Sequence, residues 1–220
     1  DSYNEGLILL KNKNYSEAIS CFSKAIVIDS IFLQAYLSRA KCYEKLDNDL
    51  AIADYLKTFE LDSTNLLPLF GIASLYLKTD KSLAAEMYTT ILSLKSDEYL
   101  AISQLGVIAF MADKYEDAEQ LFTQSLAVNT NAYTLNDRGS CYRKLDKFDL
   151  ALNDYLAAIA LNTNLAFIYS NIASIYSKQG KFDKAFRYYD LAISKDANYA
   201  LAYNNKASLL LDENKFEKAK

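Results

Sequence analysis

The apolar positions between residues 166 and 199 follow two helical patterns with a polar turn between them. The first places four residues on one helix face at spacings of 3, 1 and 3: Tyr169, Ile172, Ala173 and Tyr176. The second runs from Ala185 through Tyr189 to Ala192 and Ile193. Polar residues occupy positions 179–181 between the two patterns. This stretch therefore predicts two helices joined as a hairpin.

The same pattern recurs along the whole chain at intervals of 33 or 34 residues. A series of small residues marks the first helix: Gly6, Ala40, Ala73, Gly106, Gly139, Ala173 and Ala207. A series of alanines marks the second: Ala18, Ala51, Ala84, Ala118, Ala151, Ala185 and Ala219. An aromatic residue stands four positions after each of the first six alanines: Phe22, Tyr55, Tyr88, Phe122, Tyr155 and Tyr189. Three series in phase indicate an internal repeat.

The repeated residue types suit two closely packed helices. Small residues on facing helices let the backbones approach to roughly 8–10 Å, and the aromatic residue fills the space beside that contact. Between hairpins lie clusters of short polar residues at positions 29–30, 63–65, 130–131, 163–164 and 198. We expect their side chains to cap the helix that follows.

This pattern resembles the tetratricopeptide repeat, a helical hairpin of about 34 residues. The family signature is matched well by the fifth repeat, through Leu135, Gly139, Tyr142, Ala151, Tyr155 and Ala158. The sixth repeat matches equally, through Tyr169, Ala173, Tyr176, Ala185, Tyr189 and Ala192. The chain departs from the family in lacking tryptophan at the fourth position and proline at the thirty-second. The third repeat departs most, because its turn at 79–82 is one residue short.

The resemblance implies an all-α fold, a right-handed superhelical solenoid of antiparallel helix hairpins. We expect one array of six full repeats and a partial seventh, with boundaries at 1–32, 33–65, 66–98, 99–131, 132–165, 166–199 and 200–220. The seventh repeat stops at the start of its second helix, and a solenoid needs a polar cap on its last apolar face. We therefore expect the chain to be a fragment of a longer protein.

The composition argues against catalysis within these residues. There is no histidine, so neither a Ser-His-Asp triad nor a His-ligated zinc site can be built. The three cysteines are far apart and form no CxxC motif, which favours reduced thiols in the cytoplasm and no metal site. We expect no catalytic residues, no metal and no cofactor.

Charge and hydropathy narrow the class of partner. The net charge is −4, which argues against a nucleic-acid surface. No apolar run approaches the roughly 20 residues needed to span a bilayer, so we expect no membrane span. A protein or peptide partner is the remaining expectation.

A polar stripe on the first helices is the candidate peptide-binding groove. It lies opposite the core positions, and in the family the first helices line the concave surface. An asparagine amide can both donate to and accept from a peptide backbone. The candidate residues are Asn136, Asp137, Ser140, Lys144, Asn171, Ser174, Lys178, Asn204 and Asn205. The alternative is that these amides are ordinary solvated surface.

The earlier repeats carry a more apolar version of the same face. Its candidate residues are Leu37, Phe70, Leu77, Val107 and Phe110. An exposed apolar stripe of this length would suit an amphipathic helix. The alternative, especially for Phe110, is burial against an adjacent repeat.

Three further signals can be interpreted from single positions. The chaperone-tail carboxylate clamp of the family needs lysine at the fifth and second positions, and this chain has none there, so we expect no such ligand. Cys42 and Cys141 occupy small core positions and are expected to be buried and inert. Arg138 and Arg143 lie close to Asp137 in sequence and could form either a functional cluster or surface ion pairs.

The expected function is a non-catalytic scaffold for protein–protein interaction, with a partner's peptide or helix in the concave groove. One alternative is the regulatory or substrate-recruiting arm of a larger enzyme, such as a glycosyltransferase. Another is self-association through the end repeats.

Overall fold

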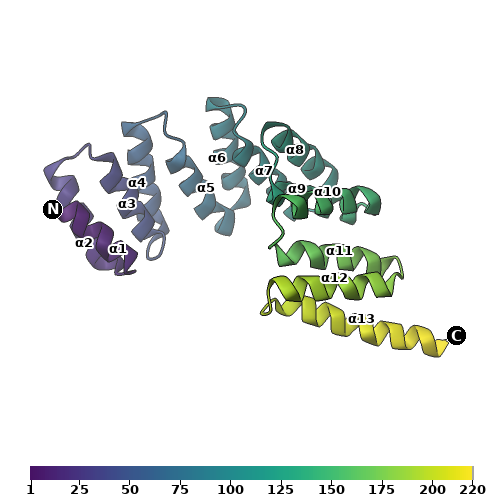
Figure 1. Ribbon diagram of the computed structural model, residues 1–220. Helices are drawn as coiled ribbons and strands as arrows, with labels where there is room; N and C mark the ends of the chain where they lie inside the picture. Colours follow the sequence, from purple (N-terminus) through teal and green to yellow (C-terminus); the bar gives the residue numbers. More distant parts are fainter. Residues whose placement is uncertain (220) are drawn as a thin grey trace. The chain divides into compact units, whose positions relative to one another are not determined.

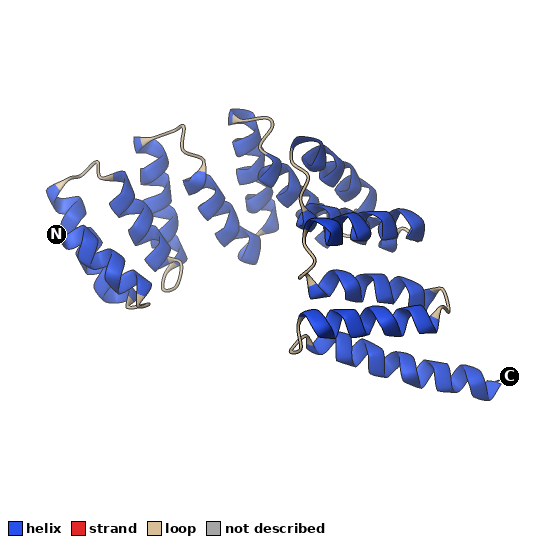
Figure 2. Cartoon of the chain, in the orientation of Figure 1, coloured by secondary structure: helices blue, strands red, loops and turns tan. Residues whose placement is uncertain are grey.

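The structure is a computed structural model that describes the backbone of residues 1–219 and the side chains of residues 1–211. The described backbone contains 13 α-helices and no strands (Figure 2). The prediction of an all-α chain built from helical hairpins is confirmed.

The chain divides into two compact units, Asp1–Ser96 (unit one) and Asp97–Lys220 (unit two). Unit one contains α1 (Ser2–Lys11), α2 (Tyr15–Ile28), α3 (Leu33–Tyr43), α4 (Asn48–Leu61), α5 (Leu67–Thr79) and α6 (Lys81–Leu94). Unit two contains α7 (Tyr99–Met111), α8 (Tyr115–Val128), α9 (Ala132–Lys144), α10 (Phe148–Leu161), α11 (Ala166–Lys178), α12 (Phe182–Lys195) and α13 (Ala200–Ala219). Figure 1 shows the helices paired as antiparallel neighbours within each unit.

Small and aromatic residues meet across each hairpin as the repeat pattern predicts. A Cβ atom added to Gly139 would lie 2.9 Å from the ring of Tyr155, and one added to Gly106 would lie 2.8 Å from the ring of Phe122. Tyr155 and Phe122 are both fully buried. The aromatic ring thus fills the space that the glycine leaves, which lets the two helices approach closely.

Four of the hairpin turns share one backbone conformation. In the fifth repeat the N–H of Lys147 donates to the carbonyl of Tyr142, five residues earlier, and Asp146 takes a φ of 55°. This bond and the left-handed residue inside it form a Schellman motif, which satisfies free carbonyls at a helix end. The left-handed residues occupy the same repeat position in all four turns: Lys13, Asp113, Asp146 and Gly180.

The second and third repeats turn differently. Asp47 caps α4 by accepting from the backbone N–H groups of Asp49 and Leu50, and Asp80 caps α6 by accepting from those of Ser82 and Leu83. A capping aspartate satisfies amides that no helical carbonyl can reach. The turn of the third repeat is a single residue between α5 and α6, in agreement with its predicted shortness.

The prediction that polar clusters between repeats cap the next helix is confirmed at two of them and wrong before α3 and α11. Asn131 accepts from the N–H of Thr134 in α9 at 2.9 Å, and Asn65 accepts from the N–H of Leu67, the first residue of α5, at 3.0 Å. Elsewhere an Asp or Asn side chain accepts from the backbone two residues later, as Asp62 does from Thr64 and Asn162 from Asn164. These local Asx turns compete with capping for the same side-chain oxygen.

The seventh repeat differs from its sequence pattern. The pattern places the start of a second helix at Ala219, but α13 continues through Ala219 without interruption.

Candidate functional site

Three polar side chains of the candidate groove are hydrogen-bonded in series in unit two. Asn171 on α11 donates its Nδ2–H to Oδ1 of Asn136 on α9 at 2.9 Å, and Asn136 donates to Oδ1 of Asp137 at 3.0 Å. Asn136 is only 9% exposed, whereas Asn171 and Asp137 are half-buried. The amide row is therefore already paired within the protein.

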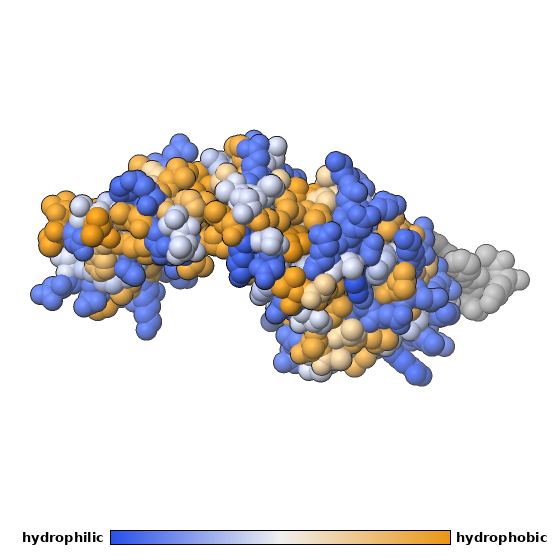
Figure 3. All heavy atoms as spheres, turned by 90° about the horizontal axis from the view of Figure 1, so that it is seen from above, coloured by the Kyte–Doolittle hydropathy of each residue, from blue (hydrophilic) through white to orange (hydrophobic). Residues whose placement is uncertain are grey.

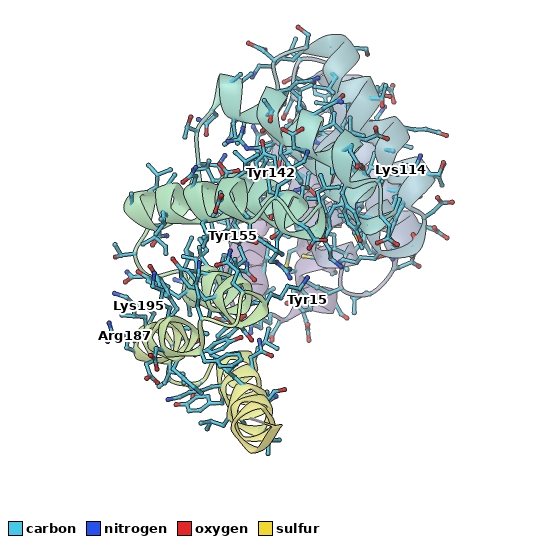
Figure 4. The ribbon with its side chains drawn as sticks, turned by 90° about the vertical axis from the view of Figure 1, so that its right-hand side faces the viewer. Tyr15, Lys114, Tyr142, Tyr155, Arg187 and Lys195 are labelled. Carbon is cyan, nitrogen blue, oxygen red and sulfur yellow. The ribbon has the colours of Figure 1, made fainter. Side chains whose placement is uncertain are left out.

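Ser140 connects this series to the core of the hairpin. Its hydroxyl donates to the carbonyl of Asn136 at 2.9 Å and lies 3.1 Å from the hydroxyl of Tyr155 on α10. Burial raises the pKa of the Tyr155 phenol, while the bond to Ser140 and the nearby charge of Arg143 oppose that rise. Figure 4 shows Tyr142 and Tyr155 among the green helices of unit two, with Arg187 and Lys195 at its outer edge.

A cavity of about 220 Å³ opens beside these groups in unit two. It is lined by Val107 and Phe110 of α7, Phe122 of α8, and Asp137, Ser140 and Arg143 of α9. Burial raises the pKa of the Asp137 carboxyl, and the hydrogen bond from Asn136 acts in the opposite direction. The Nε–H of Arg143 is buried and has no hydrogen-bond partner.

The remaining polar candidates lie at the surface. Lys144 is exposed, with its Nζ 5.5 Å from the centre of the Tyr115 ring. Lys178 pairs with Asp146 at 3.7 Å, which in an exposed setting contributes little to stability. Ser174 is half-buried on α11; on α13, Asn204 is exposed and Asn205 is half-buried.

The apolar candidates are divided between the two units. Leu37, Phe70 and Leu77 are half-buried in unit one, and the Phe70 ring lies 6.1 Å from that of Tyr88 in the same unit. Val107 and Phe110 pack against the core around Phe122 in unit two. All five side chains therefore combine partial burial with a remaining accessible surface.

The most exposed large apolar side chains of unit one lie elsewhere. Val27 is 85% exposed, Ile28 82% and Ile31 71%. Figure 3 shows apolar atoms, in orange, over much of unit one on the left of the view. Sequence reasoning did not single out these three residues.

The structure corrects the interpretation of Arg138 and adds a feature that the sequence did not reveal. Arg138 pairs with Asp154 on α10 through two bonds of 2.8 Å, rather than with Asp137, and also donates to Thr123 on α8. The same arrangement occurs in unit one, where Arg39 pairs with Asp54 at 2.8 and 2.7 Å and donates to Ser23. Each arginine thus connects the second helices of two successive repeats.

The prediction that Cys42 and Cys141 are buried is confirmed. Cys42 and Cys141 are fully buried, and burial raises the pKa of their thiols to about 11 and about 12 respectively. No group of three or more potential metal ligands occurs among the described residues. In the part of the chain that the structure describes, no helix has the length and apolarity to cross a membrane.

Comparison with known families and structures agrees with the helical-hairpin repeat. Models described as tetratricopeptide repeat match residues 2–31, 132–165 and 168–198. No curated protein matches the chain in sequence. The family matches thus fall on the first, fifth and sixth repeats.

Solved structures with the same fold cover nearly the whole chain. The APC/C hetero-tetramer Cut9-Hcn1 matches at a TM-score of 0.73 and 24% identity over 95% of this chain and 42% of that one. The C-terminal part of a TPR repeat-containing protein from Cytophaga hutchinsonii matches at a TM-score of 0.70 and 22% identity. The match covers 93% of this chain and 83% of that one. YrrB, described as a TPR protein with an unusual peptide-binding site, matches at a TM-score of 0.61 and 22% identity. The match covers 84% of this chain and 97% of that one.

This chain spans less than half the length of the matched chain of the Cut9-Hcn1 structure. At these identities the structural matches establish the fold, and the family models establish the repeat type. Together with the helical hairpins and the repeated small, alanine and aromatic positions, they show that the chain belongs to the tetratricopeptide repeat family.

Proposed function

We propose that this chain is a non-catalytic scaffold that binds an extended peptide of a partner protein along α9, α11 and α13 of unit two. The family supports protein–protein interaction in general. The observation that carries the peptide proposal is the hydrogen-bonded series from Asn171 through Asn136 to Asp137. It fixes the orientation of the amides before a partner arrives, which lowers the entropic cost of binding.

The paired amides still have capacity for a ligand. Asn171 uses one N–H toward Asn136, and its carbonyl oxygen and second N–H are left to face a peptide backbone. Asn205 stands at the equivalent position of the next repeat and is half-buried. The site described in YrrB supports peptide binding as a function available to this fold. We also propose that the repeats have the boundaries given above and that the protein lies in the cytoplasm.

The test is partner binding by a double variant, Asn171→Ala with Asn205→Ala. Partners are first captured with the full chain and identified, and the affinity of each is then measured by titration. We expect at least a tenfold loss, about 1.4 kcal/mol, for two lost amide contacts. Asn164→Ala, on the exposed loop before α11, is the matched control. Unchanged affinity in the double variant with unchanged helicity would remove the proposal.

A further inference from the structure

The outward face of α13 is the starting point, because it carries apolar side chains that are exposed to solvent. Figure 1 shows α13 beside α12 at the end of unit two. One face of α13 is buried in the core shared with α11 and α12, through Ala202 and Leu209. The opposite face carries Tyr203, which is 48% exposed, and Leu210, which is 45% exposed. Large apolar side chains gathered on one exposed face indicate a surface for a partner.

The equivalent face of α11, 34 residues earlier in the chain, is covered. Ala166, Tyr169 and Ala173 are all buried there. Ala173 lies in one core cluster with Tyr189 of α12, the antiparallel second helix of that hairpin. The corresponding face of α13 is exposed and consists of Ala200, Tyr203, Ala207 and Leu210. Residues of these sizes thus suit packing against an antiparallel helix.

The four residues follow the spacing of a coiled-coil seam. Ala200 and Ala207 are seven residues apart, and each is followed three residues later by a large residue, Tyr203 or Leu210. Apolar residues at alternating spacings of three and four keep one helix face turned toward a partner helix. This part of α13 therefore offers two heptads for pairing with another helix.

The side-chain sizes decide the direction of a second α13 on this face. In a parallel pair, Ala207 would face Ala207 and Tyr203 would face Tyr203, so that a gap would lie next to an overpacked layer. In an antiparallel pair with its twofold axis beside residue 205, Tyr203 faces Ala207 of the second copy and Leu210 faces its Ala200. Each layer then combines one small and one large side chain. The face is complementary to itself only in the antiparallel direction.

We propose that a second copy of this chain docks on α13, with the two α13 helices antiparallel and related by a twofold axis. Such an interface is isologous, because each copy contributes the same surface. The Ala–Tyr contact that it repeats between chains already joins α11 to α12 within the hairpin, through Ala173 and Tyr189. Asn205 is two positions before Ala207 and so lies about 200° away around the helix. The dimer is therefore independent of the proposed peptide site, and either can fail without the other.

The direct test is sedimentation equilibrium of the full chain at increasing concentration. One helix pair forms a small interface, so we expect a Kd of about 10–100 µM. The average mass should rise from that of one chain to that of two and then stop, because a twofold interface closes on itself. The mass of a single chain at every concentration up to about 1 mM would overturn the proposal. Growth beyond two chains would overturn the twofold arrangement.

Single variants locate the interface on α13. Tyr203→Lys and Ala207→Glu should each weaken self-association by about tenfold or more, because each places two unpaired charges in the interface. Leu201→Lys is the matched control, since Leu201 is also apolar and 52% exposed but lies on another side of α13. Circular dichroism verifies that all three variants remain helical. Unchanged self-association in both interface variants, or an equal loss in the control, would contradict the inference.

A mixture of the two interface variants tests the antiparallel direction. In the mixed dimer, Lys at 203 of one chain faces Glu at 207 of the other, and the second layer keeps its native Tyr–Ala contact. We expect the mixture to form a heterodimer that is tighter, by about fivefold or more, than the self-association of either variant alone. A parallel pair would place residue 203 against residue 203 and would show no such recovery. Absence of recovery would overturn the antiparallel arrangement.

Discussion

The ion pair between Arg138 and Asp154 offers the sharpest test of how this chain is stabilised. We consider Asp154→Ala, which removes both bonds of 2.8 Å and leaves the guanidinium without its carboxylate. The Asp154 side chain is 9% exposed and that of Arg138 21%. The change therefore leaves a charge mostly shielded from water.

The expected cost follows from this burial. Removing one partner of a fully buried ion pair lowers the free energy of unfolding by about 3–5 kcal/mol. Arg138 retains its bond to Thr123, lies over the Tyr142 ring at 5.8 Å and reaches some water, which reduces the cost. We expect a loss of about 2–3 kcal/mol in the free energy of unfolding of unit two.

The matched control is Asp190→Ala. Asp190 on α12 pairs with Lys206, but its side chain is 60% exposed, so the same substitution should cost less than about 1 kcal/mol. Urea unfolding followed by circular dichroism measures both variants. Repeat proteins need not unfold in one step, so hydrogen exchange of α8–α10 should locate the destabilisation.

A loss of stability in Asp154→Ala no larger than that in Asp190→Ala would refute a stabilising role for the partly buried ion pair. An independent repetition is available in unit one, where Asp54→Ala breaks the equivalent pair with Arg39. A small effect at Asp154 with a large effect at Asp54 would restrict the argument to unit one.

Three further predictions concern the core and the cavity. Gly139→Val should cost about 1–3 kcal/mol in urea unfolding, because its Cβ would lie 2.9 Å from the Tyr155 ring; a neutral result would mean that the hairpin can widen. Cys141, with a pKa of about 12, should resist a thiol reagent at pH 8 until the chain is unfolded, and rapid labelling of the folded chain would contradict its burial. Burial raises the pKa of Asp137, so its ionisation destabilises the fold as the pH rises through that raised value. Asp137→Asn should therefore increase stability at pH 7 relative to wild type but not at pH 3, as measured by thermal unfolding; an equal effect at both values would assign the change to packing.

The repeat period predicts the hairpins well because core positions follow directly from side-chain size. A glycine at 139 and a tyrosine at 155 already indicate which helices meet. The polar turn at 179–181 is likewise predictable, since it contains the glycine that takes a left-handed conformation. These features depend on local or strictly periodic information.

The ion pairs could not be predicted in the same way. Arg138 and Asp154 are 16 residues apart on different helices, and a charged residue on an amphipathic helix is usually solvated. Nearness in sequence favoured Asp137 as the partner, but successive helix positions point about 100° apart and do not face each other. The matching Arg39–Asp54 pair was the available signal, since both arginines occupy the same repeat position.

Part of the candidate site could not be predicted from the sequence either. The amide composition of the groove is visible in the sequence, but the bond from Asn171 to Asn136 depends on the spacing of α9 and α11. The unpartnered Nε of Arg143 depends on the burial of one atom. Residue periodicity describes faces of helices, whereas these properties belong to individual atoms.

The arginines that bond to two successive repeats have a consequence for the order of unfolding. In a repeat array, stability is the sum of what each repeat contributes and what each junction contributes. Arg39 strengthens the junction of α2, α3 and α4, and Arg138 that of α8, α9 and α10. Each compact unit thus contains a junction that is reinforced by a partly buried ion pair. Under a pulling force we expect the helices outside these junctions to detach first, and these two groups of three helices to be the last to remain folded.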